Sequence, residues 1–362
     1  MADRVFNFSA GPGVMPEPVL RQIQQDVWNI AGSGVGILEH SHRGKVVDKA
    51  FEDCVADLKS VMGIPDGYTV MFMTGGASAQ FYLLPMNFLP RDRTADYIVT
   101  GEWAKKAYQQ AARFGNPHKA ASSEDRNNSY IPSRDQTKYS ERPAYLHFTS
   151  NNTIFGTEFH AEPKPPEGVP LICDMSSDIC SRPVDVSKYA LIYAGAQKNL
   201  GPAGVTVVIA RDSLIEAGNK DLPEMLQYRT YTKEISRTNT PPVFGVYAVG
   251  LVLKWIKENG GLEAMGERNR AKARTIYEVL DGSTFYKGHA RADSRSLMNI
   301  TFNLPTPELE EKFAKEAKAA KLDALKGHRS VGGIRASVYN AFPREGCEAL
   351  AKFMREFEKA NK

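Results

Sequence analysis

The chain has few cysteines, and none lies in a pair typical of a redox or zinc site. Four cysteines occur in 362 residues, Cys54, Cys173, Cys180 and Cys347, and none belongs to a C-x-x-C motif. This spacing argues against a disulfide framework and against a zinc site. Unpaired thiols fit a reducing compartment, so we expect a cytoplasmic protein without a bound metal.

Long apolar runs and an excess of one charge are also missing. No stretch approaches the roughly 20 apolar residues of a membrane span, and the first residues, 1–4, lack the apolar core of a signal peptide. The 46 basic and 42 acidic residues leave a net charge of +4. Nucleic-acid binding usually requires a clustered basic face, so we expect neither a membrane nor a nucleic acid as partner.

Short apolar runs alternate with helical patterns, which predicts an α/β fold with a mostly parallel central sheet covered by helices. At this length the chain forms one large or two medium domains. The expected strands are Tyr68–Met73, Asp96–Val99, Ala144–Phe148, Val169–Cys173, Ala190–Tyr193 and Val205–Ala210.

Helical spacing of apolar residues predicts a helix from about Phe244 to Trp255, stopped by Gly260 and Gly261. Thr306-Pro307 opens another helix, and a third carries the stripe Leu350, Phe353 and Phe357. From about residue 263 a polar helix is followed by the strand Leu297–Phe302, the helix opened by Thr306-Pro307, a loop and the last helix, which predicts a smaller α+β domain. The polar segment 121–143 is expected to form a surface excursion.

A lysine follows one of the buried strands and is surrounded by small residues. Lys198 lies in YAGAQKNLGPAG at 193–204, where small neighbours allow a bulky planar group to approach the backbone. A lysine removed from water has a lowered pKa, which a Schiff-base amine requires. A single lysine in a glycine-rich turn is, however, more often an exposed residue.

An acidic residue ends the preceding strand. Asp174 follows Leu171-Ile172-Cys173, and one crossover between adjacent parallel strands would bring it to the same sheet edge as Lys198. A pyridinium nitrogen needs such a carboxylate to stay protonated. The alternative for Asp174 is a helix cap or a turn.

Three further segments could bind anions. The turn Gly75–Ser78 follows a strand, and backbone N–H groups at a helix start can form an anion site. Two clusters combine histidine and arginine, at 40–45 and at 326–335. Arginines flanked by glycines suit bidentate binding of carboxylate or phosphate, although ordinary solvated charge explains each one separately.

Together these segments resemble the phosphoserine aminotransferase family, which consists of fold-type-I pyridoxal-phosphate enzymes among the class-V aminotransferases. The resemblance covers nearly the whole chain. Its most specific motifs are YAGAQKNLGPAG at 193–204 and GHRSVGGIRAS at 327–337, and it also includes FNFSAGP at 6–12, SHRG at 41–44 and NTPP at 239–242.

The resemblance implies a role for each matching residue around pyridoxal phosphate. Lys198 would hold the cofactor as a Schiff base and move the substrate proton, and Asp174 would pair with the ring nitrogen. The remaining cofactor contacts would be Trp103 stacked on the ring, Thr153 at the ring hydroxyl, Ala77, Ser78 and Gln197 at the phosphate, and Asn239 and Thr240 reaching that phosphate from the second subunit of a homodimer.

The substrates implied are L-glutamate and a phosphorylated keto acid, 3-phosphohydroxypyruvate. Their carboxylates and phosphate would be bound by Arg335, Arg43, His42, His328 and Arg329. The products would be 2-oxoglutarate and O-phospho-L-serine, a step of serine synthesis, and a related step of vitamin B6 synthesis is also open. Some members have an arginine where this chain has Ser78, which leaves more of the phosphate binding to His328 and Arg329.

The implied organisation is an N-terminal arm at 1–15, a large cofactor-binding domain at 16–262 and a small domain at 263–362. Segment 119–143 and Phe155 have no implied role. Within the same fold, an alanine–glyoxylate aminotransferase or a cysteine desulfurase is the alternative. Cys347 disfavours a desulfurase because it begins a helical pattern instead of lying in a mobile loop. A nucleotide-binding or non-catalytic scaffold protein would leave Asp174, Lys198 and the basic clusters unexplained.

Overall fold

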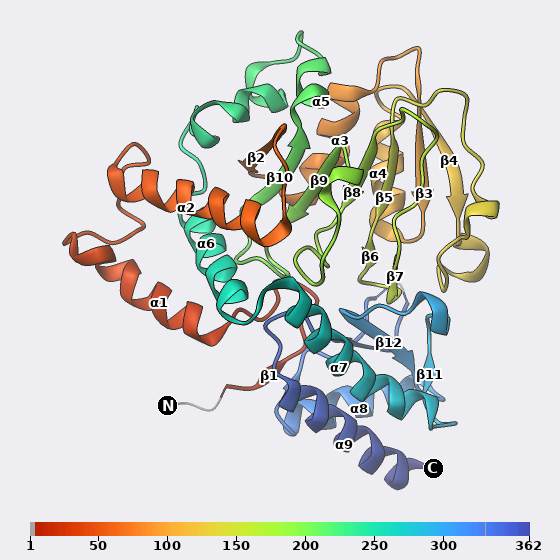
Figure 1. The fold of residues 1–362 in the computed structure, drawn as a ribbon. Coiled ribbons are helices and arrows are strands. Elements are labelled where there is room, and N and C mark those ends of the chain that lie inside the picture. The colour runs from red at the N-terminus through yellow and green to blue at the C-terminus, as the bar shows by residue number, and fades with distance from the viewer. Residues whose placement is uncertain (1–3, 330) are drawn as a thin grey trace.

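A computed structural model describes residues 4–329 and 331–362 (Figure 1). The central element is a seven-stranded sheet with the order β2-β10-β9-β8-β5-β3-β4. Strand β10 runs antiparallel to both of its neighbours, and the remaining pairs are parallel. The predicted α/β fold with a mostly parallel sheet is confirmed.

The strands of this sheet are β2 (Tyr68–Met73), β3 (Thr94–Val99), β4 (Asn116–Ser122), β5 (Leu146–Thr149), β8 (Leu171–Asp174), β9 (Leu191–Gly195) and β10 (Thr206–Arg211). The helices are α1 (Glu17–Trp28), α2 (Lys45–Met62), α3 (Gly76–Phe88), α4 (Glu102–Ala111), α5 (Asp212–Ala217), α6 (Val243–Glu258), α7 (Gly261–Asp281), α8 (Pro307–Ala319) and α9 (Arg344–Asn361). None of the helices in the described part of the chain is long and apolar enough to span a bilayer.

Helices cover both faces of the sheet, which explains why its strands are nearly continuous apolar runs. In β2, Val70 and Phe72 belong to the apolar cluster that includes α2 and α6. Met71 and Met73 belong to the cluster on the opposite face, which includes α3 and α4. Successive side chains of a strand point to opposite faces, so each strand contributes to two cores.

Each predicted strand of the large sheet is present, with ends shifted by at most two residues. Strand β4 was not predicted, because its sequence NPHKAAS is polar and it lies at the sheet edge. The prediction of a surface excursion at 121–143 is therefore wrong at its start: Ala121 belongs to β4 and is buried. Tyr130, further along, is buried as well.

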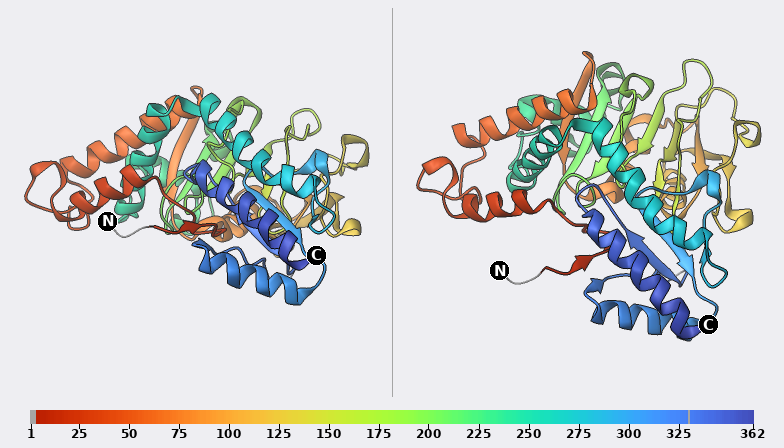
Figure 2. Two further views of the ribbon diagram at one scale, coloured as in Figure 1. Left: turned by 90° about the horizontal axis from the view of Figure 1, so that it is seen from below. Right: turned by 60° about the horizontal axis from the view of Figure 1, so that its bottom comes forward.

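A second apolar core gathers the C-terminal part of the chain and the N-terminal arm (Figure 2). Its antiparallel sheet has the order β11-β12-β14, and β1 pairs with β13 in parallel, so that Phe6 lies opposite Leu322. These strands are β1 (Phe6–Asn7), β11 (Lys287–Gly288), β12 (Asn299–Asn303), β13 (Leu322–Asp323) and β14 (Ile334–Ser337). A separate two-stranded hairpin follows β5 and consists of β6 (Asn151–Asn152) and β7 (Thr157–Glu158).

The three helices predicted from apolar spacing and capping are present as α6, α8 and α9. Helix α8 begins as expected, since the Thr306 hydroxyl accepts a hydrogen bond from the Leu309 amide. Helix α7 contributes to both cores: Leu262 and Met265 pack with the large sheet, and Ile276 packs in the second core. A boundary near residue 262 therefore falls at the start of a helix that bridges the two parts, and the division into domains stays a prediction.

Candidate active site

A cavity of about 420 Å³ opens at the carboxyl ends of the parallel strands. Its walls come from the segments that follow β2, β3, β5, β8 and β9, together with the N-terminal arm and β14. Ligands of open α/β sheets bind at this edge. The predicted site residues that line the cavity are Ala77, Ser78, Trp103, Thr153, Asp174, Gln197, Lys198, His328 and Arg335.

Asp174 and Lys198 lie together because the strands that carry them are neighbours. Strands β8 and β9 are parallel, with Asp174 paired with Tyr193, and Lys198 comes shortly after β9 ends at Gly195. Burial lowers the pKa of the Lys198 amine, while the nearby Asp174 carboxylate opposes this shift. The amine therefore has a larger unprotonated fraction at neutral pH than an exposed lysine.

The carboxyl of Asp174 is buried and yet surrounded by groups that favour its ionised form. Burial raises its pKa, and hydrogen bonds from Ser176 and the charge of Lys198 oppose that rise. The Ser176 amide donates to Asp174 Oδ1 at 3.0 Å. Near the same carboxylate, Thr149 lines the cavity and its hydroxyl has no hydrogen-bond partner among residues 4–329 and 331–362.

The glycine turn has a backbone conformation that other residues rarely adopt. Gly75 and Gly76 have φ values of 87° and 63°, and a Cβ on Gly75 would lie 2.6 Å from the Ala79 Cβ. Helix α3 starts here, so the first amides of the helix, including those of Ala77 and Ser78, have no partner within the helix. They border the cavity and provide donors for an anion.

An aromatic ring and an arginine are joined through Thr153. The indole Nε1 of Trp103 donates to Thr153 Oγ1 at 3.2 Å, and Arg335 Nη1 donates to the Thr153 carbonyl at 3.2 Å. The Lys198 amine lies 5.9 Å from the centroid of the Trp103 ring. Burial lowers the pKa of His328, and the charges of Arg335 and Arg329 lower it further.

Five predicted site residues are absent from the cavity lining: His42, Arg43, Asn239, Thr240 and Arg329. Four of them belong to two segments that lie together elsewhere. Thr240 Oγ1 is 3.5 Å from His42 Nδ1, and Arg43 Nε donates to His42 Nε2 at 3.3 Å. The side chains of Arg43, Asn239, Thr240 and Arg329 are exposed, and His42 is half-buried.

Sequence reasoning missed several residues of the cavity. Ser176 and Ser177 follow Asp174 directly, so their place in the chain could have indicated them. Asn151 could not be found in this way, because it depends on the hairpin β6–β7. Gly11 of the N-terminal arm also borders the cavity, and a Cβ there would lie 3.6 Å from the Lys198 side chain.

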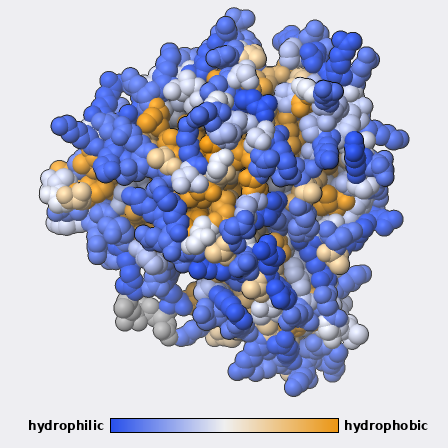
Figure 3. Space-filling model, in the orientation of Figure 1, coloured by the Kyte–Doolittle hydropathy of each residue, from blue (hydrophilic) through white to orange (hydrophobic). Residues whose placement is uncertain are grey.

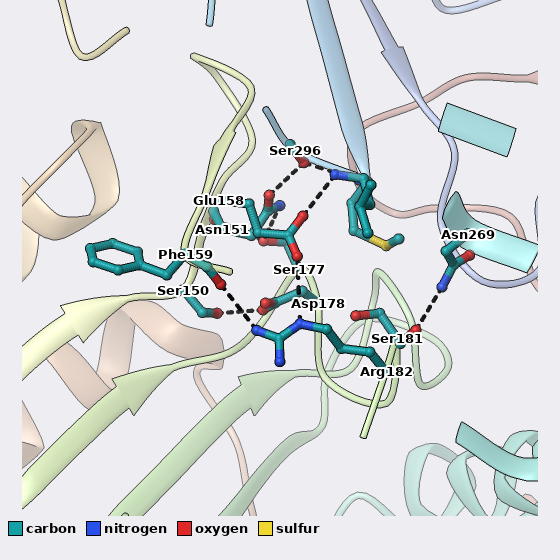
Figure 4. Close-up of polar contacts among 12 residues, drawn as sticks. Ser150, Asn151, Glu158, Phe159, Ser177, Asp178, Ser181, Arg182, Asn269 and Ser296 are labelled. Atoms are coloured by element: carbon teal, nitrogen blue, oxygen red, sulfur yellow. Dashed lines mark hydrogen bonds and ion pairs between the residues drawn. The ribbon is translucent and has the colours of Figure 1, made fainter. Parts of the chain in front are cut away.

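A closed polar network lies behind the cavity and connects the large sheet with the second core (Figure 4). Asp178 and Glu158 are buried acidic residues whose charges both act on Arg182, and Arg182 Nε is 3.7 Å from Glu158 Oε1. The other oxygen of Glu158 accepts from the Leu297 amide at 2.7 Å. Ser150 hydrogen-bonds to Asp178 and also to the carbonyl of Asp174.

The chain is similar to known proteins over its full length. Residues 5–350 match the family model of aminotransferase class-V. The chain is 52% identical to phosphoserine aminotransferase of Herpetosiphon aurantiacus, covering 98% of each chain, and 50% identical to that of Bacillus subtilis, covering 99% of each. The solved structure of phosphoserine aminotransferase from Bacillus circulans subsp. alkalophilus superposes with a TM-score of 0.97 at 50% identity, covering 99% of both chains.

Proposed function

The chain belongs to the aminotransferase class-V family, and we propose that it is a phosphoserine aminotransferase with pyridoxal 5′-phosphate as its cofactor. It would transfer the amino group of L-glutamate to 3-phosphohydroxypyruvate, giving 2-oxoglutarate and O-phospho-L-serine. The observation that carries this proposal is the position of Lys198 and the buried Asp174, which lie in one cavity at the ends of neighbouring parallel strands. The chain that holds them is about 50% identical to phosphoserine aminotransferases over its full length.

The cavity fits a planar cationic ring that carries a phosphate. Trp103 offers an aromatic face, Asp174 a buried carboxylate, and the start of α3 offers free amides with the Ser78 hydroxyl. Thr149 supplies a buried hydroxyl whose hydrogen bonding is unsatisfied by the described residues. When bound, pyridoxal phosphate supplies an electron sink that stabilises negative charge at the substrate α-carbon.

The protein's own part in the chemistry is to position groups and to move a proton. The Lys198 Nζ, with its lowered pKa, would accept the proton from the α-carbon of the bound amino acid and pass it to the cofactor carbon. In the second half of the cycle it would carry a proton in the opposite direction. The Asp174 carboxylate holds a proton on the ring nitrogen through a charge-assisted hydrogen bond. The Trp103 ring excludes water from one side.

Binding of two different anionic substrates in turn requires several cationic donors. Arg335 lies half-buried on β14 and borders the cavity, so its planar fork suits the α-carboxylate that both substrates share. His328 borders the same space and can donate to the phosphate or to the side-chain carboxylate. Arg329 would approach that group from the exposed side.

We propose that the site is completed by a second copy of the chain. His42 and Thr240 lie together outside the cavity, so if Asn239 and Thr240 reach the partner's cofactor phosphate, His42 and Arg43 accompany them. The end of α1 and the connection to α2 expose Val27, Trp28, Val35 and Leu38, with Trp28 85% exposed. In the orientation of Figure 3 this part of the chain lies at the left margin, and further apolar surface shows near the middle of the view, ringed by polar side chains. Contiguous apolar surface of this kind marks an interface.

The cysteine desulfurase alternative is not favoured. Cys347 lies in α9 and is fully buried, and burial raises the pKa of its thiol to about 12. A desulfurase requires an accessible thiolate. The other described cysteines are buried as well.

The test is a coupled assay that measures 2-oxoglutarate formed from L-glutamate with a panel of keto acids. Each acceptor is compared with and without a phosphate group. We expect 3-phosphohydroxypyruvate to give the highest kcat/KM, because the cationic groups around His328 and Arg335 gain an ion pair only with the phosphorylated acid. Equal rates with unphosphorylated acceptors would reject the proposed substrate while leaving the aminotransferase reaction intact.

A further inference from the structure

A buried histidine lies next to the strand that carries Asp174. His147, on β5, is fully buried, and its Nε2 is 3.0 Å from the Tyr193 hydroxyl on β9. The two rings are stacked, with centroids 6.0 Å apart and an interplanar angle of 24°. Neither residue lines the cavity, so neither can contact a ligand there directly.

Tyr193 connects this histidine to the cavity. Strand β8 lies between β5 and β9, and Tyr193 is the direct cross-strand neighbour of Asp174. Burial raises the pKa of the Asp174 carboxyl, and the neighbouring Tyr193 hydroxyl is among the groups that act as donors and lower it. Three adjacent strands thus contribute His147, Asp174 and Tyr193 to one series of polar groups, in a layer that also contains the hydroxyl pair of Tyr97 and Tyr145.

The donors and acceptors available on His147, Tyr193 and Asp174 determine the direction of the hydrogen bonds between them. Burial lowers the pKa of His147 to about 3, so the ring is neutral and has one N–H and one lone pair. The Tyr193 proton goes to the Asp174 carboxylate, because charged acceptors form the stronger hydrogen bond. The Tyr193 oxygen then accepts from His147, which requires the proton on Nε2.

The other ring nitrogen agrees with this assignment. Among residues 4–329 and 331–362, Nδ1 of His147 has no hydrogen-bond partner. A proton on Nδ1 would be an orphaned buried donor, and such donors are rarer in proteins than unsatisfied acceptors. Placing the proton on Nε2 leaves only a lone pair unsatisfied.

We propose that Tyr193 and His147 are positioning residues that hold the Asp174 carboxylate in place and in its ionised form, through hydrogen bonds running from His147 Nε2–H to Tyr193 to Asp174. This inference rests on the proposed role of Asp174 opposite the ring nitrogen. The pair never touches substrate. It fixes the orientation of the one carboxylate on which the electron-withdrawing state of the cofactor depends.

The first test is the tautomer of His147 in the cofactor-loaded protein. The chain has seven histidines, so ¹⁵N-histidine labelling gives few resonances, and the loss of one pair in His147→Gln assigns them. We expect Nε2 protonated and Nδ1 unprotonated from about pH 6 to about pH 9, because the lowered pKa of His147 keeps the ring neutral throughout this range. Protonation on Nδ1 would overturn the proposed direction.

The second test separates kcat from KM. In Tyr193→Phe the carboxylate loses one charged hydrogen bond, so we expect kcat to fall about tenfold with KM for glutamate changed less than about twofold. Tyr97→Phe is the matched control: Tyr97 is buried beside the His147 ring, but its hydroxyl lies 2.7 Å from that of Tyr145, so this variant removes a buried hydroxyl and keeps the His147–Tyr193 hydrogen bond. His147→Gln keeps an N–H donor, so its kcat should be closer to that of the wild type than the kcat of His147→Leu.

The outcomes distinguish this inference from the proposed function. If Tyr193→Phe matches Tyr97→Phe in kcat, the positioning role is wrong even though the protein is an aminotransferase. If Asp174→Asn retains full activity, the ring-nitrogen role of Asp174 is wrong, whatever the tautomer of His147. The NMR measurement does not depend on turnover and therefore remains interpretable in both cases.

Discussion

Two buried aspartates on one loop, Asp174 and Asp178, show how differently two regions of this molecule use the same side chain. Burial raises the pKa of both carboxyls, that of Asp178 to about 7. Asp174 faces the cavity, where Lys198 lies across from it. Asp178 faces the closed network of Glu158 and Arg182 (Figure 4). A raised pKa alone therefore does not mark a catalytic group, and of these two aspartates only Asp174 lines the cavity that also holds Lys198.

Two buried lysines repeat the contrast. Burial lowers the pKa of both Lys198 and Lys272. Lys272 donates to the carbonyls of Val338 and Tyr339 at 3.0 and 2.6 Å, so its ammonium is fully used in holding the segment after β14. Lys198 borders open space beside an aromatic ring. Of these two lysines, only Lys198 has space beside its amine for a ligand, so only Lys198 can react with one.

The largest effect is expected from Lys198→Ala. Removing the amine removes both the cofactor linkage and the proton acceptor, so kcat should fall at least about a thousandfold. Borohydride reduction followed by mass spectrometry should find no trapped cofactor. Lys272→Met, the control, should keep the trapped adduct and lose stability instead. A trapped adduct in Lys198→Ala would assign the anchor to another lysine.

Asp174→Asn and Asp178→Asn form a matched pair that tests the comparison directly. The neutral amide introduced by Asp174→Asn cannot hold a positive ring nitrogen, and we expect kcat to fall about a hundredfold, as for the loss of one well-placed charge in an active site. Asp178→Asn should leave kcat within about threefold, since that group has no access to the cavity. Steady-state kinetics of the two variants checks this, and equal losses would show that the network takes part in turnover.

Arg335→Ala should affect substrate binding more than chemistry. It removes a half-buried bidentate donor, so KM for glutamate should rise about ten- to hundredfold, with a smaller change in kcat. Arg335→Lys should recover part of the loss, because the charge remains but the planar fork does not. Arg344→Ala on α9 is an exposed control. An unchanged KM would place the carboxylate site elsewhere.

The sequence was sufficient for the strands and for the central pair of the site, for one physical reason. Strands buried on both faces are continuous apolar runs, and parallel neighbours end at one edge. The positions of Asp174 and Lys198 at strand ends therefore indicated their proximity. Strand β4 was missed because an edge strand needs no apolar face; its residues from Asn116 to Lys119 are mostly polar and at least partly exposed.

The other residues of the site are positioned by contacts between segments that are distant in the sequence, and local sequence patterns do not encode such contacts. Asn151 donates to Asn299 across the seam between the two cores at 2.8 Å, and Glu158 accepts from a backbone amide of residue 297. The contact between His42 and Thr240 also joins distant segments. Family resemblance named these last two residues for the site, but only the structure shows that they lie together outside the cavity.

The smallest effect concerns the stability of the closed network. The pKa of Asp178 is about 7 in the folded protein and close to 3.9 when unfolded. Between these values the folded state binds more protons, so this group's contribution to stability falls as the pH rises from about 4 to about 7. Below that window the aspartic acid and an asparagine are nearly equivalent. Above it, burial and the charge of Glu158 disfavour the ionised Asp178 carboxylate, and the charge of Arg182 offsets this only in part.

Asp178→Asn should therefore stabilise the protein at pH 8.5 by about 1–2 kcal/mol and have little effect at pH 4.5. The position of Ser150 also predicts that Asp178→Asn is stabilising at high pH. Its single hydroxyl proton cannot be donated to both Asp178 and the Asp174 carbonyl. The amide introduced by Asp178→Asn can donate to Ser150 and release that proton for the carbonyl. Urea unfolding at both pH values, at fixed protein and cofactor concentrations, measures the effect. The exposed Asp92→Asn is the control, and a variant less stable than the wild type at pH 8.5 would show that Arg182 needs both carboxylates.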